Sequence, residues 1–179
     1  MKQSGVTLIE LMVVLSIAAI LLGIGIPAFA ALIHTNRLSS LTNELISSLH
    51  LARSEAIKRN ARAVLCPSAD GSSCEASGGW HQGWLVFHDI NNNAVLDEEE
   101  SVIHARPALP DGFRVTGNGP VSRYIAYTPT GATKLISGAF QAGRLTLCND
   151  AESARTARQI IISSTGRPRS VGIELASCP

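Results

Sequence analysis

Two arginines near the end of the chain, separated by one proline, have the types and spacing for the most specific chemistry in this sequence. The stretch reads Gly166-Arg167-Pro168-Arg169. Gly166 permits a tight turn, and Pro168 fixes the backbone between the arginines. In an extended segment the two guanidinium groups project on the same side, with about 6–7 Å between their positions. That distance is close to the spacing of successive phosphates along a nucleic-acid strand, and guanidinium binds phosphate bidentately.

The charge distribution supports the same ligand, although the net charge of +1 does not call for a polyanion. Residues 1–104 carry 6 Lys/Arg and 10 Asp/Glu, whereas residues 105–179 carry 9 and 4. Four further cations in the basic half are candidates to widen a phosphate-binding patch: Lys134, Arg144, Arg155 and Arg158. The alternative is that Arg167 and Arg169 are ordinary exposed turn residues, since a motif of four residues is weak by itself.

A second candidate site is an oxygen-rich segment, residues 89–100, that matches the ligand positions of a calcium loop. The matching positions are Asp89, Asn91, Asn93, the Val95 carbonyl, Asp97 and Glu100. The sixth position of such a loop is normally glycine, and here it is Ala94, for which a left-handed conformation costs about 1 kcal/mol. We therefore favour a solvated hairpin in which Asn and Asp supply the turn geometry, and predict no metal cofactor.

Four cysteines offer either disulfides or a metal site. Three disulfide pairings are possible, and an exported domain would form them. We favour Cys66–Cys74, which closes a short loop, and Cys148–Cys178, which ties the C-terminus to a strand. Zinc is the weaker interpretation, because no Cys-x-x-Cys or His-x-x-x-His spacing occurs. The histidines are scattered: His34, His50, His81, His88 and His104.

Enzymatic activity has little support in this sequence. It contains no Gly-x-Ser-x-Gly, no phosphate-binding glycine-rich loop, and no nucleophile beside a plausible base. Trp80 and Trp84 could stack on bases or sugars, but aromatic residues make up only 4% of the chain. We expect both to anchor the packing of the domain instead.

The elements that position these residues follow from the hydrophobic pattern. Residues 34–60 form a predicted amphipathic helix whose apolar positions recur every three or four residues. These positions are Leu38, Leu41, Leu45, Leu49, Ala52 and Ala56. After residue 60 the pattern changes to short strands separated by Gly and Pro. They are predicted at 61–66, 84–88, 102–105, 113–116, 124–127, 144–148, 159–163 and 171–175. The fold class is therefore α+β, a long helix packed on an antiparallel β domain of residues 61–179.

The N-terminus is an apolar run, residues 6–33, long enough to cross a bilayer. It contains one carboxylate, Glu10, which costs roughly 2.5–3.5 kcal/mol at the centre of a membrane segment and therefore needs a partner. If the chain is cut after Gly5, the new amine on Val6 lies one helical turn away. In a bundle of similar helices this amine can meet the Glu of a neighbour.

This arrangement resembles the signal of the type IV pilin and type II secretion pseudopilin superfamily. Gly5 matches the residue before the prepilin-peptidase cut, Thr7–Glu10 reads as the TLIE core, and Val6 replaces the usual Phe. The resemblance implies a leader of residues 1–5, N-methylation of Val6, and assembly through Glu10 with major and minor pilins. It also implies a single-pass inner-membrane protein with a periplasmic domain that later joins the extracellular pilus, at or near its tip.

Within the superfamily, residues 79–87 (GWHQGWLVF) and the Asp/Asn-rich segment that follows are similar to the GspH/FimT branch. Gly166–Arg169 resembles the Gly-Arg-x-Arg motif of FimT-like minor pilins that bind DNA during natural transformation. The resemblance implies non-specific binding of double-stranded DNA. A filament-priming minor pilin without DNA affinity and a minor pseudopilin of type II secretion remain alternatives.

The N-terminal assignment makes a direct prediction about the mature protein. Protein purified from membranes or filaments should begin at Val6 when its N-terminus is sequenced. An ordinary secretory signal, cut after the small-x-small site at Ala28–Ala30, would instead give a start at Ala31. A start at Ala31 would contradict the pilin interpretation.

Overall fold

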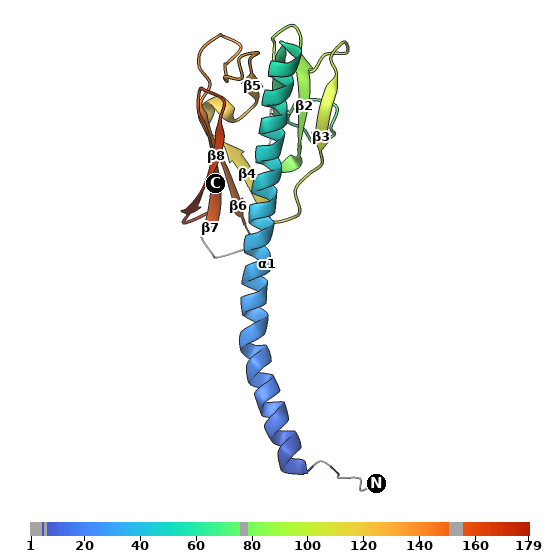
Figure 1. Ribbon diagram of the computed structural model, residues 1–179, viewed down its shortest axis with the longest axis vertical. Coiled ribbons are helices and arrows are strands. Elements are labelled where there is room, and N and C mark those ends of the chain that lie inside the picture. The colour runs from blue at the N-terminus through green and yellow to red at the C-terminus, as the bar shows by residue number, and fades with distance from the viewer. Residues whose placement is uncertain (1–4, 6, 76–78, 151–155) are drawn as a thin grey trace. The chain divides into compact units, whose positions relative to one another are not determined.

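Within the residues that it describes, the computed structural model contains one long helix and eight strands (Figure 1), which confirms the α+β prediction. It describes residues 5, 7–75, 79–150 and 156–179. The elements are α1 (Leu8–Arg59), β1 (Arg62–Pro67), β2 (Trp84–Asp89), β3 (Val102–Arg106), β4 (Phe113–Gly117), β5 (Ile125–Tyr127), β6 (Gly143–Asn149), β7 (Thr156–Ile162) and β8 (Pro168–Glu174). Two short 3-10 turns precede β2 and β5, at Trp80–Gln82 and Gly119–Val121.

The chain divides into two compact units, Met1–Arg37 and Leu38–Pro179. The first unit holds the apolar part of α1, where an 18-residue window has a mean hydropathy of 2.6 and none of it is buried. Among the described residues, α1 is the one helix long and apolar enough to cross a membrane. The helix continues through position 27, where the sequence has proline.

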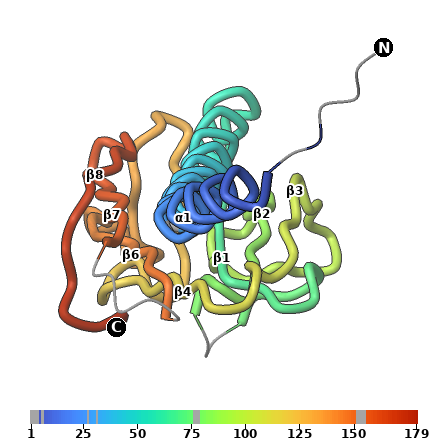
Figure 2. The backbone as a smooth tube through the Cα atoms, turned by 90° about the horizontal axis from the view of Figure 1, so that it is seen from below, coloured from blue at the N-terminus to red at the C-terminus, as the bar shows by residue number. Residues whose placement is uncertain are grey.

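In the second unit, the later part of α1 supplies one side of the hydrophobic core. The predicted stripe is buried, and Leu49, Ala52 and Ala56 have no exposed surface. The same core cluster includes Leu65 of β1 and Ile160 of β7, so this stripe packs against both sheets. Figure 2 shows the two sheets on either side of the later, teal part of α1. The periodicity of three and four residues thus places the apolar side chains where two sheets need cover.

Both sheets are antiparallel and have four strands each. The first has the order β3-β2-β1-β5 and the second β4-β6-β7-β8, so β8 is an edge strand. All eight predicted strands are present, but β7 and β8 each begin three residues earlier than expected. The hairpin register explains the shift, because Ile162 pairs with Pro168 and Ile161 with Arg169. Proline is tolerated at the first residue of an edge strand, since its missing N–H faces no partner strand.

Trp80 and Trp84 are core residues. Their exposed fractions are 0% and 1%. The Trp80 indole N–H donates to the carbonyl oxygen of Val121 at 3.1 Å, and the Trp84 indole donates to the Ser48 hydroxyl at 2.9 Å. Neither ring is available to stack on a ligand, as the sequence-based interpretation expected.

The two disulfides join the pairs that the sequence favoured. Cys66 is bonded to Cys74, eight residues further on, and Cys148 to Cys178, thirty residues further on. The second bond fastens the segment after β8 to β6. Because β6 is an inner strand of its sheet and β8 an edge strand, this bond anchors the C-terminal segment to the middle of the sheet.

Removing the disulfide that closes the longer loop should destabilise the domain more than removing the other, because the entropic effect grows with the logarithm of loop length. The chain-entropy relation gives about 3.6 kcal/mol for the longer loop and about 2.5 kcal/mol for the shorter. We therefore expect Cys148→Ser/Cys178→Ser to lower the free energy of unfolding more than Cys66→Ser/Cys74→Ser. Urea titration followed by tryptophan fluorescence measures this for the second unit, which contains both tryptophans. The opposite ranking would refute the entropic account.

Candidate nucleic-acid interface

The arginine-bearing segment is a tight turn between β7 and β8. The Gly166 N–H donates to the carbonyl oxygen of Ser163 at 2.8 Å, and Gly166 has φ +75°. That conformation suits glycine, and a Cβ at this position would overlap the carbonyl oxygen of Gly131. Gly166 is therefore required both by the backbone angle and by the approach of a second turn.

This second turn, around Gly131, holds the arginine turn in place. The Thr133 N–H donates to the carbonyl oxygen of Ser164 at 3.1 Å. The Thr133 hydroxyl lies 3.0 Å from the Ser163 carbonyl oxygen. Gly131 in turn approaches the side chain of Arg53 on α1, which a Cβ at position 131 would meet at 2.9 Å. The arginine turn thus packs against the Gly131 turn, which itself packs against α1. These contacts hold the backbone next to Arg167 in place.

Register places a third arginine in line with the motif. Arg169 of β8 pairs with Ile161 of β7, and Ile161 pairs with Arg144 of β6. Residues that pair directly share one face of a sheet, so Arg144 and Arg169 lie on the same face, two strands and about 10 Å apart. Both are exposed, as is Arg167. The opposite face of these strands carries the core residues Leu145 and Ile160.

The other cations proposed from the sequence are placed differently. Arg158 projects from the core-facing side of β7, where its Nη2 donates to the Ser39 hydroxyl of α1 at 3.3 Å, so it does not join Arg144 and Arg169. Alternation along the strand explains this, because positions 158 and 161 fall on opposite faces. Lys134 follows Thr133 directly, beside the arginine turn, and is partly buried. Arg155 lies outside the described residues.

Acidic and basic residues cluster in different parts of the chain, although the first sheet also carries Arg62 in β1 and Arg106 in β3. Residues 63–105 contain seven Asp/Glu and no Lys or Arg. Residues 112–149 and 156–173 contain no Asp or Glu and seven Lys/Arg. At the margin of the basic part, Arg114 forms an ion pair with Asp150. Arg144 and Arg169 therefore occupy a face whose own strands supply no carboxylate within these ranges, which strengthens its attraction for anions.

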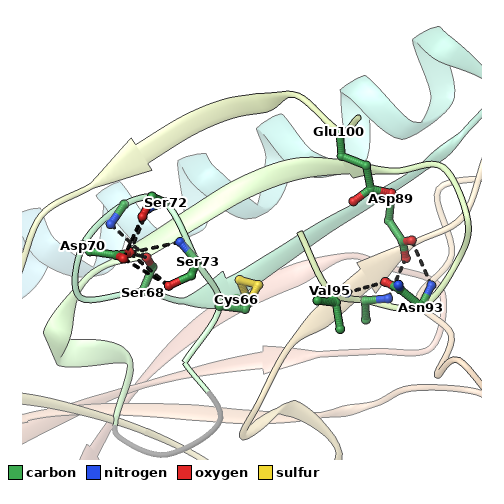
Figure 3. Close-up of a disulfide and its surroundings, with 12 residues drawn as sticks. Cys66, Ser68, Asp70, Ser72, Ser73, Asp89, Asn93, Val95 and Glu100 are labelled. Carbon is green, nitrogen blue, oxygen red and sulfur yellow. Dashed lines mark hydrogen bonds between the residues drawn. A yellow bond between two sulfur atoms is a disulfide. The ribbon is translucent and has the colours of Figure 1, made fainter. Parts of the chain in front are cut away.

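The calcium-like segment after β2 is held by its own hydrogen bonds (Figure 3). The Asp89 carboxylate accepts the N–H groups of Asn93 and Ala94 at 2.9 and 3.1 Å. Asp97 accepts the side-chain amides of Asn91 and Asn93 at 2.7 and 2.9 Å. Among the described residues no group of three His, Cys, Asp or Glu side chains lies close enough to hold a metal ion. These hydrogen bonds hold the segment in shape, and the absence of a metal cofactor stays a prediction.

Two details of this segment could not be read from its composition. Ala94 does adopt the left-handed conformation, with φ +58°, and Glu100 accepts the N–H of Ile90 at 2.7 Å. Burial raises the pKa of Asp89, although the N–H groups that it accepts act in the opposite direction. The neighbouring His88 is buried against Glu55 of α1, and burial lowers its pKa.

A second carboxylate, Asp70, organises the loop that the first disulfide closes, also drawn in Figure 3. It accepts the hydroxyl of Ser72 at 2.7 Å and the N–H groups of Ser72 and Ser73 at 2.8 and 3.0 Å. These hydrogen bonds hold the pKa of Asp70 well below its usual range. Since the acceptors are already filled by local donors, Asp70 serves the loop itself.

At the start of α1, Glu10 has a partner that the sequence analysis did not consider. The N–H and hydroxyl of Thr7 donate to the Glu10 carboxylate at 3.2 and 3.1 Å, and the Glu10 N–H donates to the Thr7 hydroxyl at 3.3 Å. This reciprocal arrangement is a capping box, and its signature, Thr-x-x-Glu, was visible in the sequence. Gly5 is exposed, and Val6 lies outside the described residues.

An apolar N-terminal helix that continues into an antiparallel β domain defines the pilin-like class of proteins. Residues 1–26 match the prokaryotic N-terminal methylation motif, and residues 41–166 match the family described as type II transport protein GspH. The chain belongs to the GspH family of minor pilins and pseudopilins, which are structural and not enzymatic. Such proteins are processed by prepilin peptidase, are held in the inner membrane by the N-terminal helix, and assemble with other pilins.

The proteins that this chain is similar to include pilins and a pseudopilin of type II secretion. A pilin-like protein of Thermus thermophilus, PilA1, is 31% identical over 182 residues, covering 94% of this chain and 99% of the relative. The type IV minor pilin FimU of Pseudomonas aeruginosa has a similar structure, with a TM-score of 0.57 and 17% identity over 82% of this chain and 98% of that one. The minor pseudopilin EpsH of Vibrio cholerae gives 0.51 and 9%, covering 75% and 96%.

The contact between the two turns predicts unequal effects of two glycine substitutions. Gly166 and Gly138 both have positive φ, but a Cβ at Gly138 would meet nothing within 4 Å. We expect Gly138→Ala to cost about 1–2 kcal/mol, the left-handed penalty alone. Gly166→Ala should cost clearly more, because the Gly131 turn must also move. Urea titration compares the two variants, and equal costs would show that the turns do not constrain each other.

Proposed function

We propose that this chain is a minor type IV pilin that joins the pilus and binds extracellular double-stranded DNA, without sequence preference, for uptake in natural transformation. The observation that carries the proposal is the common exposed face of Arg144 and Arg169, with Arg167 in the adjoining turn. Three guanidinium groups, in segments (residues 112–149 and 156–173) that contain no Asp or Glu, make a surface for a polyanion with regularly spaced charge.

The chemistry of this surface sets the kind of binding. Arginines that contact phosphates position a duplex but carry no information about base sequence. A surface of about three phosphate contacts gives modest affinity that falls steeply with salt. Modest affinity suits a subunit displayed on a filament, where several weak contacts along one DNA molecule add up through high effective concentration.

Delivery of this surface depends on the N-terminal segment. In this proposal prepilin peptidase cuts after Gly5, Val6 becomes the methylated N-terminus, and Glu10 pairs with the amine of a neighbouring pilin. Glu10 would then exchange its capping contact with Thr7 for an intermolecular ion pair. The globular unit is periplasmic before assembly and extracellular afterwards, at or near the pilus tip.

Two other functions fit the same family: a filament-priming minor pilin without DNA affinity, and a minor pseudopilin of type II secretion. The family match ends at residue 166, immediately before Arg167, so family membership does not bear on the arginine pair. DNA binding is favoured over both by the arginine face alone.

Replacing both motif arginines should remove DNA binding and leave the fold intact. We expect Arg167→Gln/Arg169→Gln to weaken binding by at least about tenfold, since hydrogen bonds to charged groups contribute most per contact. The slope of log affinity against log salt should fall by about 2, one for each lost phosphate contact. Gel shift and fluorescence anisotropy with a duplex at several salt concentrations measure both quantities, and transformation frequency should fall in parallel.

A matched control separates the arginine face from net charge. Lys58→Gln/Arg59→Gln removes the same two charges at the C-terminal end of α1, where Arg59 pairs with Glu55. This control should retain binding within about twofold. If the two double variants lose binding equally, or if neither does, the proposed site is wrong.

A further inference from the structure

An exposed aromatic ring, Phe140, belongs to a hairpin whose base is hydrogen-bonded to the arginine turn. Phe140 is 74% exposed, more than any other large hydrophobic side chain described in the second unit. Single apolar residues are normal on protein surfaces, and a phenylalanine this exposed contributes little to the stability of the fold. The residues around Phe140 therefore decide whether the ring can bind a ligand.

Phe140 belongs to a small hairpin with a rigid base. Lys134 and Phe140 form an antiparallel bridge, so their side chains share one side, and the Lys134 Nζ lies 5.9 Å from the centre of the ring. The next residue, Gln141, is fully buried. Its side-chain oxygen accepts the Ala126 N–H at 2.9 Å, and its amide donates to the carbonyl oxygens of Pro120 and Tyr124 at 2.8 and 2.7 Å.

The base of this hairpin also supports the arginine turn. Thr133 is paired with Gln141, whose N–H donates to the Thr133 carbonyl oxygen at 3.1 Å. The same Thr133 donates its N–H to Ser164, three residues before Arg167. This hydrogen bond joins the residue before Lys134 to the turn that carries Arg167. The hairpin that carries the ring and the turn that carries Arg167 are therefore hydrogen-bonded neighbours.

We propose that Phe140, with Lys134 beside it, stacks on an unpaired base of the DNA strand whose phosphates the arginines contact. A cationic track next to an exposed aromatic ring is the arrangement that binds single strands, because every base offers a π-face while its backbone carries regular charge. The inference rests on the proposed function and extends it. Stacking adds affinity at single-stranded tails, gaps and frayed ends of DNA, while the arginines bind the phosphates of the duplex.

The charges around Phe140 favour a nucleic acid over a protein as the ligand that contacts the ring. The hairpin carries a lysine and no acidic residue, and the arginine turn beside it adds two more cations. A purely apolar neighbour would leave the Lys134 ammonium without a counter-charge. A nucleotide offers both a ring for Phe140 and a phosphate for Lys134.

The test compares single-stranded and duplex DNA on the full chain, solubilised in a non-ionic detergent. Phe140→Ala should weaken binding of an oligothymidylate by about fivefold or more, the effect of losing one stacked base. Affinity for a blunt duplex of equal length should change by less than about twofold, because its bases stay paired. Ile136→Ala is the matched control, since Ile136 is 56% exposed on the same hairpin and should leave both affinities unchanged.

A gain-of-signal variant tests stacking directly. In Phe140→Trp the new indole is exposed, whereas Trp80 and Trp84 are buried and should not respond to DNA. We expect the oligothymidylate to quench the added fluorescence, and Arg167→Gln/Arg169→Gln in the same background to abolish the quenching at low oligonucleotide concentration. Absence of quenching at saturating oligonucleotide would overturn the inference.

The outcomes separate this inference from the proposed function. If the wild-type chain binds a duplex through its arginines and Phe140→Ala leaves single-strand binding unchanged, only the stacking role is refuted. If the wild-type chain binds neither probe, the proposed function itself fails. If Phe140→Ala alters self-association in sedimentation velocity but not DNA binding, the ring is a contact between copies of the chain and the inference is wrong.

Discussion

The packing of one helix face against two sheets is the interaction on which the rest of the domain depends. Each four-stranded sheet has an apolar face that it cannot bury alone, and the stripe that includes Leu45 and Leu49 covers both. Burial of a leucine contributes about 1.5–3 kcal/mol. Because β1 and β7 reach the same stripe, their outer faces are held in a fixed relation. The exposed arginine face exists because the opposite face of its strands is committed to this core.

The division of labour between the sheets follows from that arrangement. The first sheet carries the disulfide loop and the hydrogen-bonded acidic hairpin, both of which satisfy their polar groups internally. The second sheet carries Arg114, Arg144, Arg158 and Arg169, and the turn between β7 and β8 is positioned by contacts with the Gly131 turn. Rigid support of this kind places charged side chains without ordering them at the moment of binding, which reduces the entropic cost of association.

Periodicity and residue type were sufficient to predict the helix, the eight strands, the buried tryptophans and the disulfide pairs, because these depend on local pattern and on apolar burial. The site was predictable only in part. Register decides which cations share a face, so the alignment of Arg144 with Arg169, and the orientation of Arg158 toward Ser39, required the three-dimensional pairing of β6, β7 and β8. Contacts between distant turns, such as Gly131 with Gly166, leave no signal in sequence spacing. The capping role of Glu10 is encoded in the pattern Thr-x-x-Glu at residues 7–10. The same residues also match the pilin signal, which assigns Glu10 a different partner.

The separation of the acidic segment 70–100 from the basic segments 112–149 and 156–173 gives the domain a permanent electric dipole. An approaching polyanion exerts a torque on such a body before any side chain touches it, and the torque turns the basic sheet toward the polyanion. At physiological ionic strength this field reaches about 8 Å. Within that range, random collisions become oriented encounters, and association speeds up without any increase in the strength of the final contacts.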